Sequence, residues 1–428
     1  MASIEMGRPV YGISLVEPKH SLLKLSIHAL LVYLACYGLI SIYVDNIIVR
    51  SLKDVGMSLL AIYALSKVYH EQRTFIVPFL FLLGSIFFLG SLNLLLGGSF
   101  VALIYGFKIT FLPMMMVFIG MLIAKFNAVE LFARTNLFIL VLLIIGWLIQ
   151  YSLGIEKLIS LGFVYGVNIK NYFEGVPRLP SITYSPDGYA YALLISGLIA
   201  EKVRLARNYR IIRLSIQLLT ISFLFMSTIR SALVLWGVYQ IVMFLLHMRQ
   251  YNKRNLLLLS SVFFLLPAAT VLGVQVLNNY NLLSVTSMLD RFQNWGYGLT
   301  SPFTMHGMIG NGIGAVGAAS RRMNMIGLQS RDYAVDSQFF SFYEQIGLIG
   351  VMYISILFLW IMHSLIKRMK QLPVTDRMKL PQTAIGLVVG VAAASVTTNV
   401  LEMFPSNVFL WLFVGAALYQ HRKTEEIP

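Results

Sequence analysis

The feature that most constrains this chain is a succession of apolar runs, many of them close to the length of a membrane crossing, separated by short polar breaks. About 20 apolar residues let a helix cross the hydrocarbon core of a bilayer. The 428 residues are 58% hydrophobic and 12% charged, and the mean hydropathy is +0.76, which excludes an ordinary water-soluble domain. Continuous runs also exclude a membrane β-barrel, because barrel strands alternate between apolar and polar residues.

We therefore predict an all-α integral membrane protein that forms a single polytopic domain over residues 1–428, with about 12 transmembrane helices. The predicted helices cover residues 22–43, 55–69, 77–96, 100–124, 136–152, 187–201, 211–228, 231–248, 255–277, 337–364, 382–399 and 404–420.

The formal net charge of +15 follows the predicted topology. With both termini in the cytoplasm, 22 of the 33 Lys and Arg residues fall on inside segments, whereas the 18 acids divide almost evenly. This positive-inside pattern supports twelve crossings with both termini in the cytoplasm. Anionic lipid and orientation account for the basic excess, so we expect the lipid bilayer and no nucleic acid as a partner. The single cysteine, Cys36, excludes an intramolecular disulfide and is expected to pack inside the first helix.

Two predicted outer connections are much longer than the others, at 153–186 and 278–336. Long loops in compact membrane domains are usually functional. The larger one contains Trp295, Tyr297 and Phe303 together with many glycines, so we predict a folded cap on the outer side.

Arginines gather on the predicted outer side. Their planar, multiply donating heads suit phosphate oxygens, and together they predict an anion site at the membrane surface. Arg230 is the most informative, because it lies between two helices joined by almost no loop; a snorkelling interfacial arginine is the structural alternative. The candidate arginines are Arg178, Arg230, Arg291, Arg321, Arg322 and Arg331.

Four further residues are candidates for a polar site. Lys108 lies in the middle of a predicted helix and must face a cavity or pair with a buried acid. Asp336 stands where the large loop enters a helix, and it fits either an N-cap or a base that takes a proton from a sugar hydroxyl. Glu344 follows inside the membrane and requires a polar partner. His306 is the outer-side histidine, and no cluster has metal-ligand spacing, so we predict no metal and no cofactor.

Four segments of the chain resemble the family of O-antigen polymerases and O-antigen ligases, which are membrane glycosyltransferases of the GT-C class. The likeness covers the C-terminal two-thirds of the sequence, whereas the first five helices match only in hydropathy. The segments are RLPSITYSPDGYAYALL, STIRSALV, DRFQNWGYGLTSPFTMHGMIGNGIG and DSQFFSFYEQIGLIGV.

The resemblance implies a polymerase of lipopolysaccharide O-antigen or exopolysaccharide that uses undecaprenyl-pyrophosphate-linked oligosaccharides as donor and acceptor. Arg230 and Arg291, joined by Arg178, would contact the pyrophosphate, and Asp336 would act on the acceptor hydroxyl. A chain-length regulator protein is a further implied partner. The active site would face the periplasm, and the reaction would be inverting and independent of metal.

The ligase branch of this family carries a histidine where the chain has Asp336, although the frame of Ser337, nine residues and Gly347-x-x-Gly350 is shared. This departure favours the polymerase. Two alternatives stay open: a ligase that transfers glycan to lipid A core, and a flippase or transporter of lipid-linked sugars. The transporter is disfavoured because such carriers concentrate polar residues along interrupted helices near the bilayer midplane.

Overall fold

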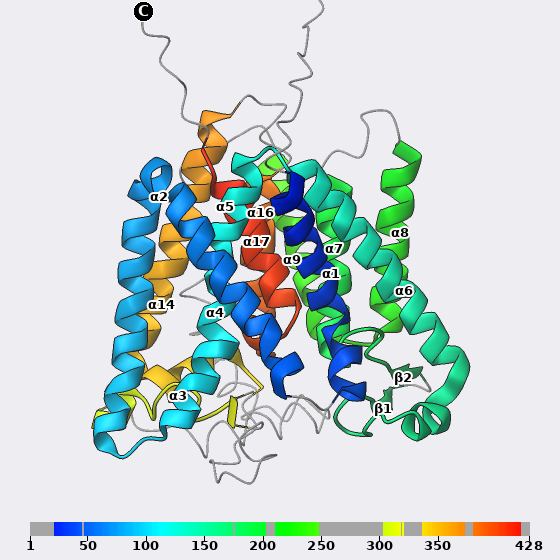
Figure 1. Cartoon of the computed structure of the whole chain (residues 1–428), viewed down its shortest axis with the longest axis horizontal. Coiled ribbons are helices and arrows are strands. Elements are labelled where there is room, and N and C mark those ends of the chain that lie inside the picture. Colours follow the sequence, from blue (N-terminus) through cyan, green and yellow to red (C-terminus); the bar gives the residue numbers. More distant parts are fainter. Residues whose placement is uncertain are drawn as a thin grey trace, which may run out of the picture.

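The structure is a computed structural model that describes residues 21–44, 47–173, 176–202, 210–247, 303–317, 319–320, 336–372 and 380–420. These residues are mostly helical and form one bundle, with a small strand pair at the lower end in Figure 1. Five helical segments are long and apolar enough to cross a membrane, and shorter apolar helices accompany them. The five segments are Lys24–Tyr43, Ser51–Leu96, Phe100–Lys125, Val129–Ser160 and Gln338–Gln371.

The first two elements supply three of the predicted helices. Helix α1 covers Ser21–Tyr43, and α2 covers Ile47–Ser91 with a kink at Gln72 (φ −115°, ψ 22°). A straight helix of this length would reach about 68 Å, more than twice the hydrocarbon thickness of about 30 Å. Figure 1 shows instead that α2 rises, turns at its upper end and descends beside itself. The predicted helices 55–69 and 77–96 are its two halves, and the 3-10 helix η2 (Leu92–Leu96) follows.

The predicted helix 100–124 is interrupted in the middle. It consists of α3 (Phe100–Gly106), the π-helix η3 (Phe107–Phe111), α4 (Leu112–Met114) and α5 (Met116–Lys125). π-helical turns inside α-helices are uncommon and frequently accompany functional sites.

Helix α6 (Val129–Ser160) descends to the lower end and bends at Gly154, whose φ of +77° ends the regular helix. The lower connection that follows was predicted as a long outer loop. It carries an antiparallel pair, β1 (Lys170–Phe173) and β2 (Val176–Arg178), and then leads into α7 (Pro186–Lys202). Helices α8 (Arg210–Met226) and α9 (Arg230–His247) form the next hairpin. The predicted helix 255–277 lies outside the described residues.

The C-terminal part contains the short helix α12 (Met305–Ile309) and α14 (Gln338–Gln371), followed by α16 (Pro381–Ala394), the 3-10 turn η4 (Val400–Glu402) and α17 (Ser406–Leu418). Helices α16 and α17 are only about 21 Å and 20 Å long, and Figure 1 shows that α17 begins inside the bundle, above its lower rim. The connection between them, residues 395–405, is therefore enclosed by other helices.

The core is built around α17, whose side chains are all buried. It packs on α5 so closely that a Cβ added at Gly120 would lie 2.0 Å from the carbonyl oxygen of Leu412, and one at Gly415 would lie 2.0 Å from that of Val117. Close backbone approach through small residues is the usual way to pack helices in a membrane, where lipid leaves little hydrophobic drive for association. In Figure 1, α2 and α14 flank this centre on one side, and α6 and α8 on the other.

Candidate functional site at the lower end of the bundle

Helix α14 is broken close to the lower end of the bundle. Gly347 has a φ of +66°, a backbone conformation that favours glycine, and the break leaves the carbonyl groups of Glu344 and Gln345 without helical partners. The backbone amides of Asn311 and Gly312 donate to them, at 2.8 and 2.9 Å. We call residues 307–317 the glycine loop. It repairs the break and thereby fixes the short helix 338–346 against the long part of α14.

A buried carboxylate lies where this short helix meets the connection between α16 and α17. Oε1 of Glu402 accepts hydrogen bonds from Gln338 Nε2 at 3.2 Å, Ser341 Oγ at 3.1 Å and Gln345 Nε2 at 3.3 Å. All four residues are buried. We call them the Glu402 cluster. A carboxylate inside a membrane bundle is energetically unfavourable unless donors surround it, so these amides and the hydroxyl account for its presence.

Each amide of the Glu402 cluster also ties down a piece of backbone. Oε1 of Gln338 accepts from the amide of Leu401 at 3.1 Å, and Oε1 of Gln345 accepts from that of Gly314 at 2.9 Å. The glycine loop, the short helix 338–346 and η4 are thus connected through one polar network. At Gly317 a Cβ would lie 2.8 Å from Oε2 of Glu402, so a larger residue there would push on the carboxylate.

Asp336 is not the N-cap of α14, in contrast to one of its two predicted roles. The N-cap is Ser337, and its side chain makes no capping hydrogen bond. The first free amide of the helix, that of Gln338, donates instead to the carbonyl of Ser395 at 2.9 Å. A neighbouring carbonyl therefore does what a cap would do. Asp336 is half-buried and lies two residues before Gln338, a donor to Glu402, and its role as a base stays a prediction.

Glu344 has the polar partner that its predicted depth requires. It is buried, and its Oε2 accepts a hydrogen bond from Asn311 Nδ2 at 3.0 Å. Asn311 thus holds both the side chain and the backbone carbonyl of this residue.

Arg178 is held at the turn that precedes Arg230. Arg178, at the end of β2, donates from Nε to Thr228 Oγ1 at 3.1 Å and from Nη2 to the carbonyl of Thr228 at 3.4 Å. Thr228 lies in the short turn between α8 and α9, and exposed Arg230 begins α9 two residues later. The turn is therefore as tight as the sequence predicted, and it brings two guanidinium groups to the lower end.

This arginine turn is packed against the connection that carries Glu402. The hydroxyl of buried Tyr191 on α7 lies close to the side chains of Ser231 and Thr398. Ser231 follows Arg230, and Thr398 lies four residues before Glu402, so the start of α9 and this connection are neighbours at Tyr191.

Lys108 pairs with an acid, Asp54, which is partly buried rather than buried as one of its two predicted readings required. Its Nζ lies 2.5 Å from Oδ2 of Asp54, while Nζ of Lys53 lies 2.5 Å from Oδ1 of the same carboxylate. Lys53 is also 4.9 Å from the ring centroids of Tyr37 and Phe404. We call Lys53, Asp54 and Lys108 the lysine pair site.

Several predicted site residues lie outside the described residues. These are Arg291, Arg321, Arg322 and Arg331, together with most of the predicted cap at 278–336. His306 is described: it is an exposed residue of α12, and its carbonyl accepts from the amide of Gly310 at 2.7 Å. Among the described residues, no group of three His, Cys, Asp or Glu side chains is arranged to hold a metal ion.

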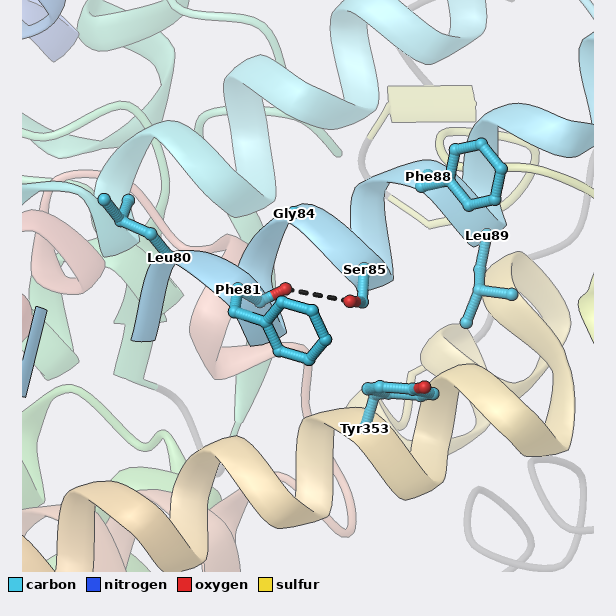
Figure 2. A pocket seen from close by; sticks show the side chains of 7 residues that line it. All are labelled: Leu80, Phe81, Gly84, Ser85, Phe88, Leu89 and Tyr353. Carbon is cyan, nitrogen blue, oxygen red and sulfur yellow. Dashed lines mark hydrogen bonds between the residues drawn. The ribbon is translucent and has the colours of Figure 1, made fainter. Parts of the chain in front are cut away.

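A separate apolar groove of about 490 Å³ runs between α2 and α14. In Figure 2, Phe81 and Leu89 of α2 point toward Tyr353 of α14, and the hydroxyl of Ser85 donates to the carbonyl of Phe81 on its own helix at 2.9 Å. A second groove, of about 680 Å³, lies between α1 and α6 beside His28. Both are lined mainly by apolar side chains and suit hydrocarbon chains rather than sugars.

Sequence reasoning missed Glu402 and its ligands, as well as Lys53 and Asp54. For Glu402 a signal was present: an acid stands in the four residues between the predicted helices 382–399 and 404–420, where it was counted as an ordinary loop charge. The three ligands of Glu402 on α14 carry no such signal, because single polar residues among apolar ones are common in long helices.

No protein-family model matches the chain, and no curated protein matches it. The resemblance to the O-antigen polymerases and ligases therefore rests on the four sequence segments alone.

Proposed function

We propose that the protein is a GT-C-type polysaccharide polymerase of the bacterial inner membrane, with 12 crossings, cytoplasmic termini and a site that faces the periplasm at the lower end of the bundle. It would transfer a growing glycan from undecaprenyl pyrophosphate to a lipid-linked repeat unit. The observation that carries the proposal is the presence of a buried carboxylate network and an arginine turn at the same end of a bundle of apolar helices.

The arginines suit the leaving group. Arg230 is exposed, and Arg178 is held by Thr228 beside it, so both can present N–H groups to the pyrophosphate of a donor. Stabilising the charge that develops on the leaving group is the largest electrostatic demand of this reaction. The predicted third member, Arg291, would complete the site.

The carboxylates suit the acceptor. Asp336 would take the proton of the acceptor hydroxyl as that oxygen attacks the anomeric carbon and the bond to the pyrophosphate oxygen breaks. Glu402 would act through position: it binds Gln338 and Ser341 and so fixes the start of α14, where Asp336 stands. Holding two lipid-anchored substrates in register contributes more here than strong base catalysis, because pyrophosphate leaves readily.

Transport of a lipid-linked sugar is the second candidate, and one structural feature favours it. Helices α14 and α16–α17 are interrupted inside the bundle, and charged side chains lie at the interruptions. Secondary transporters place their binding sites at such breaks. The ligase alternative differs from the polymerase only in its acceptor.

A reconstitution separates these functions. The purified protein in vesicles receives undecaprenyl-pyrophosphate-linked repeat units alone, with EDTA present, and the products are resolved by size. A ladder of repeat lengths is the expected result. Single transfer that requires added lipid A core would indicate a ligase, and movement of intact repeat units across the bilayer without any transfer would indicate a carrier.

Variants then test the assigned residues. Arg230→Ala is expected to lower the rate of polymer formation at least about a hundredfold, roughly 3 kcal/mol at the transition state. Lipid-linked repeat units should then accumulate on the outer side of the membrane. If the protein were a carrier, the same variant would leave these units on the inner side. Arg134→Ala is the matched control, because Arg134 is an exposed arginine of α6 paired with Glu130 within its own helix. Equal rates for the two variants would remove Arg230 from the site.

A further inference from the structure

The lysine pair site, Lys53, Asp54 and Lys108, is a second charged centre in the membrane part of the molecule, and the proposed reaction as described above leaves it unused. Its two ammonium groups share one carboxylate, so the site itself carries one more positive than negative charge. Charged side chains at membrane depth are expensive and are usually retained for a ligand or a pathway.

The geometry separates the roles of the two lysines. Lys53 is 5% exposed and is enclosed by Asp54 and by the rings of Tyr37 and Phe404. The side chain of Lys108 is 25% exposed and that of Asp54 is 15% exposed. An ammonium group has three donors, and Asp54 occupies one on Lys108. Lys108 is therefore the group that can reach a ligand, with Lys53 as the charge behind it.

Both lysines of the site lie toward the lower ends of their helices. Lys53 lies about 9 Å along α2 from its lower end, and Lys108 about 12 Å from the start of α3. Lys108 is part of the π-helix η3, whose carbonyl at Ile109 accepts from Asn407 Nδ2 at 3.4 Å. The same Nδ2 donates to the carbonyl of Leu401 at 3.0 Å, so the lysine pair site is coupled to the turn that carries Glu402.

Phe404 completes the connection. Its ring contacts Lys53, and it lies two residues after Glu402. The arginine turn approaches the same connection through Tyr191 and Thr398. Two basic centres on different helices thus adjoin the α16–α17 connection, one at the α8–α9 turn and one on α2 and η3.

We infer that the lysine pair site binds the pyrophosphate of the second lipid-linked substrate, the acceptor, while the arginine turn binds that of the donor. This inference rests on the proposed function. A polymerase, unlike a ligase that transfers to lipid A core, uses two substrates with the same pyrophosphate head, and two separate basic centres meet that demand. The aromatic rings of Tyr37 and Phe404 stabilise the ammonium group of Lys53, and by excluding solvent they increase its electrostatic effect on neighbouring groups.

Binding without turnover tests the inference. The full chain in phosphatidylcholine nanodiscs is titrated with undecaprenyl pyrophosphate, and the number of bound molecules is read by native mass spectrometry. Wild type should bind two, and Lys108→Gln should lose one of them or bind it at least about tenfold more weakly. Lys108→Arg keeps the charge and should retain both. Lys157→Gln, an exposed lysine at the end of α6, is the matched control.

Asp54→Asn distinguishes an anion site from a structural ion pair by the sign of its effect. Removing the competing carboxylate should tighten binding of the second molecule about tenfold, because the two lysines then face the ligand alone. An ion pair that only holds α2 to η3 would give a less stable protein with unchanged binding. If Asp54→Asn does not fold, the contrast between Lys108→Gln and Lys108→Arg decides alone.

The controls separate the two proposals. If binding of undecaprenyl pyrophosphate depends on Lys108 but no glycan ladder is made, the anion site is supported and the polymerase proposal is contradicted. The opposite result has two parts: the wild-type protein makes a glycan ladder, and Lys108→Gln still binds two molecules of undecaprenyl pyrophosphate. This result would contradict the anion site and support the polymerase. Competition by phosphatidylglycerol but not by inorganic pyrophosphate would overturn the substrate assignment in favour of an ordinary lipid head group.

Discussion

The upper and lower ends of the bundle hold their helices in different ways. Toward the upper end, α5 and α17 touch backbone to backbone at Gly120 and Gly415, and Glu71 accepts from Lys125 and from Tyr419, both at 2.6 Å. The glycine contacts join two regular helices, and Glu71, beside the kink of α2, ties the ends of α5 and α17 to the turn of α2.

At the lower end the helices are interrupted. Polar side chains and free backbone groups at the breaks in α14, η3 and η4 satisfy one another through the Glu402 cluster and the glycine loop. Regular helices use their backbone groups internally, whereas interrupted ones leave these groups to other partners. In the part of the chain that the structure describes, the upper end thus provides a frame, and the interruptions at the lower end leave polar groups for other partners.

The largest effect should come from the frame. Gly120→Val would drive two methyl groups into the backbone of α17, so we expect a loss of about 3 kcal/mol or more and little folded protein. Thermal unfolding in detergent measures this. Gly237→Val is the matched control, because a Cβ at Gly237 on α9 meets no atom within 4 Å. Similar melting temperatures for the two variants would contradict the view that backbone contacts at the upper end stabilise the bundle.

An intermediate effect on stability, with a large effect on activity, should come from the lower end. In wild type, Oε1 of Glu402 accepts three hydrogen bonds. Glu402→Gln introduces an amide, so at least one of the three donors loses its partner, and the free energy of unfolding should fall by about 1 to 3 kcal/mol. Polymer formation should fall more than tenfold because the start of α14 is no longer fixed. Glu130→Gln, an exposed acid of α6, serves as control. A Glu402→Gln protein with wild-type stability and rate would show that the network neither supports the fold nor positions the site.

The smallest effect concerns the hydrogen bond from Tyr419 to Glu71 at the upper end. Tyr419→Phe removes one hydrogen bond to a carboxylate that keeps Lys125 as a partner, so we expect a loss of about 1 kcal/mol and an unchanged reaction rate.

The same hydrogen bond makes the stability of the protein depend on pH, and the sign of this dependence follows from the pKa of Tyr419. Burial, and then the carboxylate of Glu71, raise the pKa of the Tyr419 phenol well above its usual range. A raised pKa in the folded state means that this stabilisation is complete below the unfolded pKa of about 10 and is lost as the pH rises beyond it. Unfolding temperatures of wild type and Tyr419→Phe should therefore converge above about pH 10. A constant difference across that range would exclude titration of Tyr419.

Much of the fold was predictable because hydropathy reports the apolar faces that a bilayer requires. The predicted helices at 22–43 and 187–201 match α1 and α7 within a few residues. The turn that places Arg230 at a helix start was also predictable, since too few residues separate the two apolar runs for a longer loop.

The interruptions were not predictable from hydropathy, because an apolar window is equally apolar whether its backbone is regular or broken. The break at Gly347 and the π-helix around Lys108 lie within continuous apolar runs. Asp54, the partner of Lys108, was placed outside any helix, so the ion pair depended on a contact between segments far apart in the sequence.

The break at Gly347 also constrains how the protein enters the membrane. Until the glycine loop docks, the carbonyls of Glu344 and Gln345 would face hydrocarbon without donors, at several kcal/mol each. The loop precedes α14 in the chain, and in the proposed topology it reaches the outer side of the membrane before α14 is inserted. Insertion of α14 would then depend on a loop that has already crossed. Substitutions in the glycine loop should consequently appear in a cell as protein removed during synthesis rather than as an inactive protein in the membrane.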